Sequence, residues 1–111
     1  MKKLSDKHNV KIVTNDNFDV TVTNNAFTII DCWAAWCGPC RIYSPIIDEL
    51  AEKYPKVAFG KLNVDENEDI MRRFGIMSIP TTLFFREGQL VDTIIGAVPK
   101  TIIEEKIQIL T

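Results

Sequence analysis

Two cysteines lie three positions apart in the segment WCGPC, residues 36–40, and their spacing could support redox chemistry. Residues three apart on a helix have Cβ atoms about 5–6 Å apart, and a disulfide needs about 3.8 Å, so a small adjustment closes the bond. The closed loop is so short that loop closure contributes little stability. The spacing therefore favours a disulfide that opens and closes over a structural cross-link.

The same residues mark the start of a predicted helix, which favours an ionised thiol. Pro39 suits the first helical position, where a missing N–H costs little. Unpaired N–H groups and the helix dipole favour an anion there and lower a thiol pKa. We predict that Cys37, nearer the open loop, is the nucleophile and that the deeper Cys40 is the resolving thiol. Gly38 and Pro39 add neither bulk nor charge, so the approach stays open.

Metal binding is the main alternative use of such a pair. Zinc takes four protein ligands in structural sites, and Cys37 and Cys40 supply two. The third cysteine, Cys32, is predicted inside the sheet as a small buried hydrophobe, and the single histidine, His8, lies near the N-terminus. The three cysteines match the first three ligands of a plant-type iron–sulfur pattern, whose fourth is missing, and a c-type haem motif needs His where Arg41 stands. We expect no metal and no cofactor beyond a redox-active disulfide.

Length and composition indicate an ordinary globular protein. The chain has 111 residues, of which 46% are hydrophobic and 25% charged. A net charge of −2 argues against nucleic acid as a partner, and no apolar run approaches the ~18 residues of a membrane span. We read residues 1–8 as a flexible tail and residues 9–111 as one domain. Three cysteines are too few for a secreted disulfide framework, so we expect a cytoplasmic protein. We also expect a monomer.

The elements that would position the cysteines follow from hydrophobic periodicity. Strands are predicted at residues 10–13, 27–33, 57–64, 81–86 and 90–96, and helices at 15–21, 65–74 and 99–110. A further helix should start near Gly38-Pro39, with apolar residues at helical spacing as far as Ala51. The nearly continuous apolar run Phe27–Trp33 suits a central strand buried on both faces. Asp65 and Glu68 are expected to cap the third helix. The order predicts an α/β three-layer sandwich, with a central mixed sheet of about five strands flanked by about four helices.

With these residues in hand, the chain closely resembles the thioredoxin family. The segment 36–40 matches the family's active-site motif residue for residue, Asp31 matches its buried acid, and Ile79-Pro80-Thr81 resembles its cis-proline loop. The resemblance extends from about residue 10 to residue 110 and implies a thioredoxin-like fold. A bare CxxC is weak evidence, whereas the five-residue motif together with the acid, the proline loop and the element order is strong evidence.

The resemblance implies a protein-disulfide reductase that works by thiol–disulfide exchange. Its implied partners are disulfide-containing proteins and a separate thioredoxin-reductase-like protein that recycles the oxidised form. An oxidase or isomerase of the same fold is an alternative, because a reduction potential cannot be read from sequence. A non-catalytic binding partner is a third hypothesis, and such a role would survive loss of both sulfurs.

Two charged residues carry roles that depend on the resemblance. Asp31 interrupts an apolar run, so burial should raise its pKa, and its implied role is to carry a proton for Cys40. Lys61 is expected nearby, tuning Asp31. The structural alternative is an ion pair between Asp31 and Lys61 or a solvated strand end.

A docking surface for substrate proteins is expected around the sulfurs. Trp36 should shield the nucleophile and offer contact area. A cis Pro80 would bring the backbone of Ile79 beside the sulfurs, where a substrate strand could pair with it. Met77 stands where the family commonly has a basic residue, which makes the rim more apolar. The expected substrate-binding residues are Trp36, Gly38, Pro39, Met77, Ile79, Pro80, Gly96 and Ala97.

Overall fold

The computed structural model describes residues 9–111, so the predicted tail at 1–8, with His8, lies outside the described residues. Strands and helices alternate and end in a hairpin followed by a helix, in the predicted order. The strands are β1 (Val10–Ile12), β2 (Phe27–Trp33), β3 (Ala58–Asn63), β4 (Thr81–Arg86) and β5 (Gln89–Ile95). The helices are α1 (Phe18–Thr23), α2 (Gly38–Lys53), α3 (Glu68–Arg73) and α4 (Lys100–Leu110).

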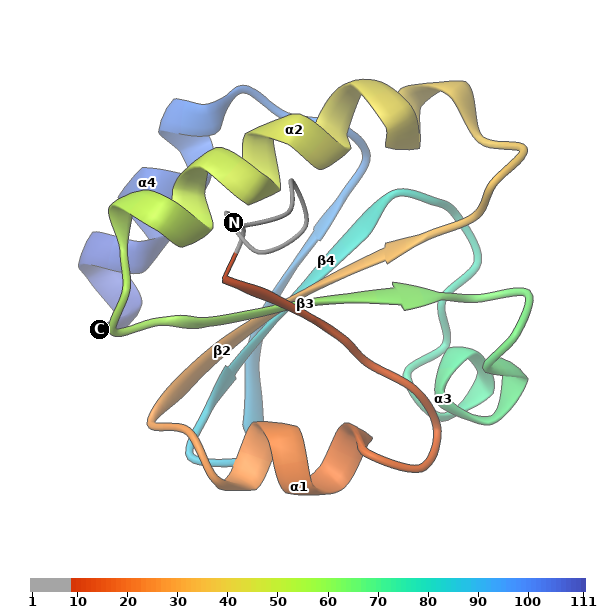
Figure 1. Ribbon diagram of the computed structural model, residues 1–111, viewed down its shortest axis with the longest axis horizontal. Helices are drawn as coiled ribbons and strands as arrows, with labels where there is room; N and C mark the ends of the chain where they lie inside the picture. The colour runs from red at the N-terminus through yellow and green to blue at the C-terminus, as the bar shows by residue number, and fades with distance from the viewer. Residues whose placement is uncertain (1–8) are drawn as a thin grey trace, which may run out of the picture.

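The five strands form one mixed sheet in the order β1-β3-β2-β4-β5. β2 pairs in parallel with β3 and antiparallel with β4, and β4 continues antiparallel to β5. Figure 1 shows α2 and α4 on one face of the sheet and α1 and α3 on the other. The three-layer sandwich predicted from the sequence is therefore confirmed.

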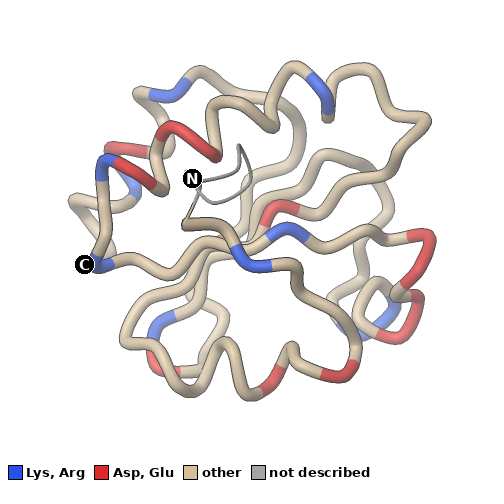
Figure 2. Tube along the Cα trace, in the orientation of Figure 1, with Lys and Arg blue, Asp and Glu red and all other residues tan. Residues whose placement is uncertain are grey.

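A hydrophobic cluster fills each face of the sheet, and alternation along the strands assigns each side chain to one of them. Ile29 and Phe59 pack under α2 and α4, while Ile30 and Cys32 pack toward α1 and α3. Asp31 lies two residues beyond Ile29, so its side chain is on the α2 face. Charged residues of both signs are interspersed over the described part of the chain (Figure 2).

Two helices begin later than predicted, because side chains stabilise a turn before each one. Asn17 accepts from the backbone N–H of Thr14 at 2.8 Å and donates to the carbonyl of Ile12, so α1 starts only at Phe18. Before α3, the Asn67 amide donates to the Asn63 carbonyl at 2.9 Å. The N-cap of α3 is therefore residue 67, and the predicted cap at Asp65 is wrong.

Candidate active site

The two cysteines of WCGPC form a disulfide at the junction between β2 and α2. Cys37 is the N-cap of α2, and its Sγ accepts a hydrogen bond from the backbone N–H of Cys40 at 3.2 Å. Pro39 lies in the first turn, where its missing N–H costs nothing. Both cysteines are almost fully buried, while Gly38 and Pro39 between them are exposed.

A loop from a distant part of the chain lies against this sulfur pair. The Ile79–Pro80 peptide bond is cis, as the resemblance implies, and the Ile79 carbonyl oxygen lies 3.8 Å from Cys37 Sγ. Gly96 donates its backbone N–H to the Pro80 carbonyl at 2.7 Å and has φ +96°, a conformation that glycine adopts without strain. The segments that follow β2 and precede β4 thus meet at Cys37, and the segment that follows β5 is hydrogen-bonded to the proline loop.

The surroundings of the disulfide carry exposed apolar side chains. Trp36 is 68% exposed and Met77 is 95% exposed. The indole N–H of Trp36 donates to the Asp65 carboxylate at 2.9 Å, which fixes the ring. Met77 also lines a hollow of about 220 Å³ together with Ile95 of β5. Sequence reasoning missed Asp65 and Ile95 here, although the outward position of Ile95 on an alternating strand was a usable signal.

Ala97 is exposed next to Gly96 in the segment that follows β5. Pro80, in contrast, is buried, and its carbonyl is the acceptor for Gly96. The predicted substrate-binding residues therefore divide into exposed surface around the disulfide and buried backbone that supports it.

Asp31 is buried in β2 without a counter-charge bonded to it. It is 0% exposed, and among residues 9–111 neither carboxyl oxygen has a hydrogen-bond partner. The pKa of Asp31 is raised from 3.8 to about 7, and burial is the main cause. This net value already includes a lowering effect of the Lys61 charge and a raising effect of the Asp48 charge. A carboxyl of this kind can take up or release a proton near neutral pH.

Lys61 lies beside Asp31 in the sheet but bonds elsewhere. Its Cα is the parallel partner of Asp31 across β2 and β3. Its ammonium donates to Ser44 Oγ at 2.5 Å and to Asp48 Oδ1 at 2.7 Å, both on α2. Lys61 therefore lies next to Asp31, as expected from the sequence. Its ion pair, however, is with Asp48 and not with Asp31.

A second polar pair connects β4 to α2 next to Asp31. The hydroxyls of Tyr43 and Thr82 are 2.7 Å apart, and Thr82 is the antiparallel Cα partner of Asp31. The pKa of Tyr43 is raised to about 12, mainly by burial. The hydrogen bond to Thr82 works against this rise, and the Asp31 charge adds to it. Sequence reasoning missed Tyr43, Ser44, Asp48 and Thr82. The spacing of four between Ser44 and Asp48 was the available signal, since it places both on one side of α2.

A cavity of about 240 Å³ connects the disulfide region to this polar group. It is lined by Trp33, Cys40, Arg41, Ser44 and Lys61. Trp33 is half-buried, and with Cys40 it forms part of the cavity wall. The cavity has space and polar groups for water beside Cys40.

The third cysteine is separated from this chemistry. Cys32 is completely buried on the α1 and α3 face, and burial raises the pKa of its thiol well above the ordinary range, with the Asp31 charge adding to the effect. A thiol in such a place reacts poorly. Among residues 9–111 no group of three or more metal-binding side chains is found.

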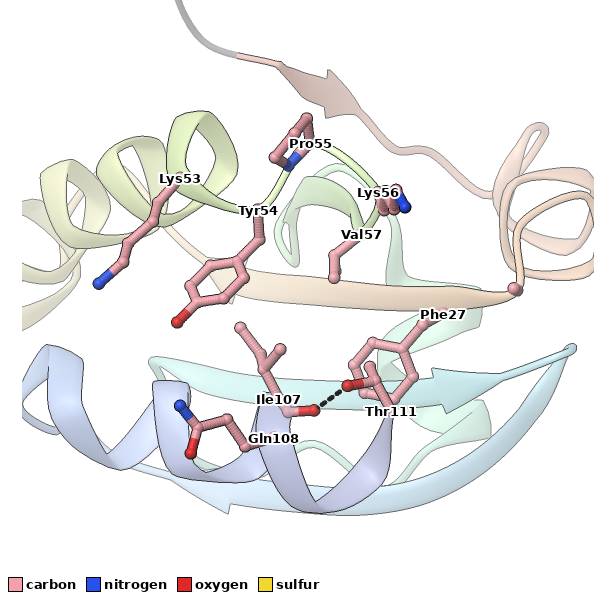
Figure 3. Close-up of a pocket in the computed structure, with 10 residues that line it drawn as sticks. Phe27, Lys53, Tyr54, Pro55, Lys56, Val57, Ile107, Gln108 and Thr111 are labelled. Carbon is pink, nitrogen blue, oxygen red and sulfur yellow. Dashed lines mark hydrogen bonds between the residues drawn. The ribbon is translucent and has the colours of Figure 1, made fainter.

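Another cavity, of about 470 Å³, lies at the other end of the sheet. Figure 3 shows Tyr54, Val57, Phe27 and Ile107 around it, from the start of β2, the loop after α2 and the end of α4. No cysteine lines it. It is therefore separate from the redox site.

The amino-acid sequence matches one protein family over nearly all of the described residues. The thioredoxin family model covers residues 9–109. The thioredoxin of Pyropia yezoensis is 48% identical over 94 residues, covering 83% of this chain and 88% of that protein. Thioredoxin 1 of Synechococcus elongatus is 46% identical over 80% of this chain and 85% of its own length. The chloroplastic M-type thioredoxin of Pisum sativum is 45% identical, and this chain spans 59% of its length.

Solved structures agree with the sequence comparisons. Thioredoxin from Plasmodium falciparum superposes with a TM-score of 0.84 at 34% identity, covering 91% of this chain and 99% of that one. The chain belongs to the thioredoxin family. Thioredoxins are disulfide oxidoreductases, and the homology together with the Cys37–Cys40 pair supports dithiol–disulfide reductase activity. Within residues 9–111, no helix has the length and apolar character needed to cross a bilayer.

Proposed function

We propose that this chain reduces disulfides in other proteins, with Cys37 as the attacking thiolate and Cys40 as the resolving thiol. The observation that carries the proposal is the position of Cys37 Sγ at the start of α2. There it accepts a hydrogen bond from the backbone N–H of Cys40, with 3.2 Å between nitrogen and sulfur. In the dithiol form the same N–H and the helix dipole would stabilise a thiolate on Cys37.

The reaction proceeds by two exchanges that conserve atoms and electrons. The Cys37 thiolate attacks one sulfur of the substrate disulfide, forming a mixed disulfide and releasing the other substrate sulfur as a thiolate, which takes up a proton. Cys40, after losing its proton, attacks Cys37 Sγ. The mixed disulfide breaks, the second substrate sulfur leaves, and two electrons have passed from the dithiol to the substrate.

Asp31 is proposed to accept the proton that Cys40 loses. Its pKa of about 7 gives a mixture of ionised and protonated forms at neutral pH, so it can both accept and return a proton. Lys61 is proposed to tune Asp31 through its charge, and the cavity that Cys40 shares with Lys61 offers space for water between the two groups.

Substrate proteins are proposed to dock on the exposed apolar surface around the disulfide. Trp36 and Met77 supply apolar area, and the Ile79 backbone beside Cys37 supports pairing with an extended substrate strand. The proposed binding residues are those predicted from the sequence, namely Trp36, Gly38, Pro39, Met77, Ile79, Pro80, Gly96 and Ala97.

The proposed partners are disulfide-containing proteins and a thioredoxin-reductase-like protein, with no nucleic acid and no membrane. We propose a cytoplasmic monomer of one domain that uses no cofactor beyond its disulfide. The net charge of −2 argues against nucleic acid as a partner, and the small number of cysteines supports the cytoplasmic location. Sedimentation at several concentrations tests the monomer, and a mass that rises with concentration would contradict it.

Trapping the intermediate tests the two cysteine roles. The reduced Cys40→Ser variant should retain a covalent adduct with insulin under non-reducing electrophoresis, whereas Cys37→Ser should not. Each is made in a Cys32→Ala background, so that the adduct has one possible position. An adduct on the Cys37→Ser variant, and none on the other, would reverse the assignment.

The direction of electron flow is tested by the reduction potential of the disulfide. Equilibration in dithiothreitol buffers, followed by tryptophan fluorescence, should give a value near the −270 mV typical of thioredoxin. A value at or above the −180 mV of protein disulfide isomerase would make the protein an oxidant or isomerase.

A further inference from the structure

Three polar residues form a row across the sheet beneath α2. Lys61 of β3, Asp31 of β2 and Thr82 of β4 are Cα partners in the strand registers. Paired residues of adjacent strands lie about 4.8 Å apart and point to the same face. We call these three residues the polar row, and Asp31 is its central member.

Both outer members of the polar row are bonded to α2 rather than to Asp31. Lys61 donates to Ser44 and Asp48, and the Lys61 and Asp48 side chains are 21% and 20% exposed. Thr82 shares a hydrogen bond with Tyr43. Ser44 and Asp48 are four residues apart on α2, so together they form one binding place for the ammonium.

This arrangement gives Asp31 a neighbouring cation that does not bond to it. An ammonium close to a buried carboxylate ordinarily forms a charge-assisted hydrogen bond, which keeps the carboxylate ionised. Here both carboxyl oxygens of Asp31 are without a partner among the described residues. The Lys61 ammonium is instead held at the cavity lined by Cys40 and Ser44.

We propose that Asp48, together with Ser44, is a positioning residue for thiol–disulfide exchange: it holds the Lys61 ammonium on α2 and so keeps the Asp31 carboxyl free to exchange a proton. The consequence for the reaction rests on the proton-carrying role proposed above for Asp31. The placement itself rests on the hydrogen bonds of Lys61 and the unpartnered oxygens of Asp31.

The ionisable groups around Asp31 come from three elements. Lys61 faces it from β3, and Tyr43 and Asp48 face it from α2. Cys32 is its neighbour in β2, with the side chain on the other face of the sheet. Cys40 of α2 joins this set in the reduced protein. Without Asp48, the Asp31 carboxylate loses a repelling charge and gains access to the Lys61 ammonium, and both changes favour its ionised form.

The pKa of Asp31 in the oxidised protein tests the placement directly, by its carboxyl carbon NMR signal as a function of pH. Asp48→Asn should lower this pKa by about one unit, and Lys61→Met should raise it. Glu49→Gln is the matched control, because it neutralises the next residue of α2, whose partner is Lys100 of α4. An Asp31 pKa that Asp48→Asn leaves unchanged or raises would overturn the proposal.

A double-mutant cycle separates positioning from the charge of Asp48 itself. If Asp48 acts by holding Lys61, Asp48→Asn should shift the Asp31 pKa less in the Lys61→Met background than in the wild type. Equal shifts in both backgrounds would mean that Asp48 acts only by its own charge, and the positioning role would be wrong. Both side chains are partly exposed, so circular dichroism should show all variants folded.

Single-turnover reduction of insulin separates this proposal from the function on which it rests. If both the positioning role of Asp48 and the proton-carrying role of Asp31 are correct, Asp48→Asn moves the midpoint of the pH–rate profile about one pH unit lower. The same substitution has no such effect in the Asp31→Asn background. If the Asp31 pKa shifts but the rate profile does not, the proton-carrying role of Asp31 fails and the placement stands. If Asp31→Asn changes the profile but Asp48→Asn moves neither quantity, the placement fails and the proposed function stands.

Discussion

Replacing Asp31 by asparagine should stabilise the oxidised protein, and by more at high pH than at low pH. The folded pKa of Asp31, about 7, lies above its ordinary value of 3.8. Between these two pH values the unfolded chain releases this proton while the folded chain keeps it, so wild-type stability falls as pH rises. Asparagine has no proton to lose at this position, and its stability should not show this fall.

The size of the effect follows from the two pKa values. A difference of about 3 units, at 1.36 kcal/mol for each, corresponds to about 4 kcal/mol of stability that the wild type loses by pH 8. Asp31 is completely buried, so solvent does not reduce this figure. A change of 4 kcal/mol is a large share of the 5–15 kcal/mol by which domains are stable.

Urea unfolding of both oxidised proteins at pH 4 and pH 8 measures the difference. The advantage of Asp31→Asn should grow by about 4 kcal/mol between the two pH values. Asp92→Asn is the control of opposite sign. The bond from Lys106 lowers the pKa of Asp92, so that carboxylate stabilises the fold above its unfolded pKa and loses this effect as pH falls. Asp92→Asn should cost under about 1 kcal/mol at pH 8. An Asp31→Asn advantage that is the same at both pH values would refute the reasoning.

Three further substitutions test the packing around the site. Gly60→Ala places a Cβ 2.4 Å from Val13 Cγ2 and should cost about 1–3 kcal/mol in urea unfolding; an unchanged midpoint would show that the Val13 side chain yields freely. Tyr43→Phe leaves the buried Thr82 hydroxyl without its partner and should cost about 1–3 kcal/mol, with Phe84→Leu as a purely apolar comparison. No change in stability would mean that water or another group replaces the tyrosine. Trp36→Phe loses only the exposed bond to Asp65, so stability should change by about 1 kcal/mol or less while the KM for insulin rises. A large loss of stability with an unchanged KM would make Trp36 structural rather than a docking residue.

Local patterns in the sequence predicted most of the fold. Period-two and helical spacing of apolar residues gave the elements in their order, because burial of one face is a local requirement on each segment. The starts of α1 and α3 were predicted too early, since the turns that precede them depend on hydrogen bonds from Asn17 and Asn67. Such side-chain bonds compete with helix formation and leave no periodic signal.

The sequence by itself determined the redox pair, because two cysteines three apart at a helix start are neighbours whatever surrounds them. It also marked Asp31 as a carboxyl within an apolar strand. Tertiary structure decided which residues lie beside these groups. It places Ile79, which is 42 positions beyond Cys37 in the chain, next to the Cys37 sulfur. It also bonds Lys61 to Asp48 instead of Asp31. Periodicity assigns a side chain to one face of its strand, but only strand register and the packing of α2 on the sheet determine which residues of other elements lie beside it.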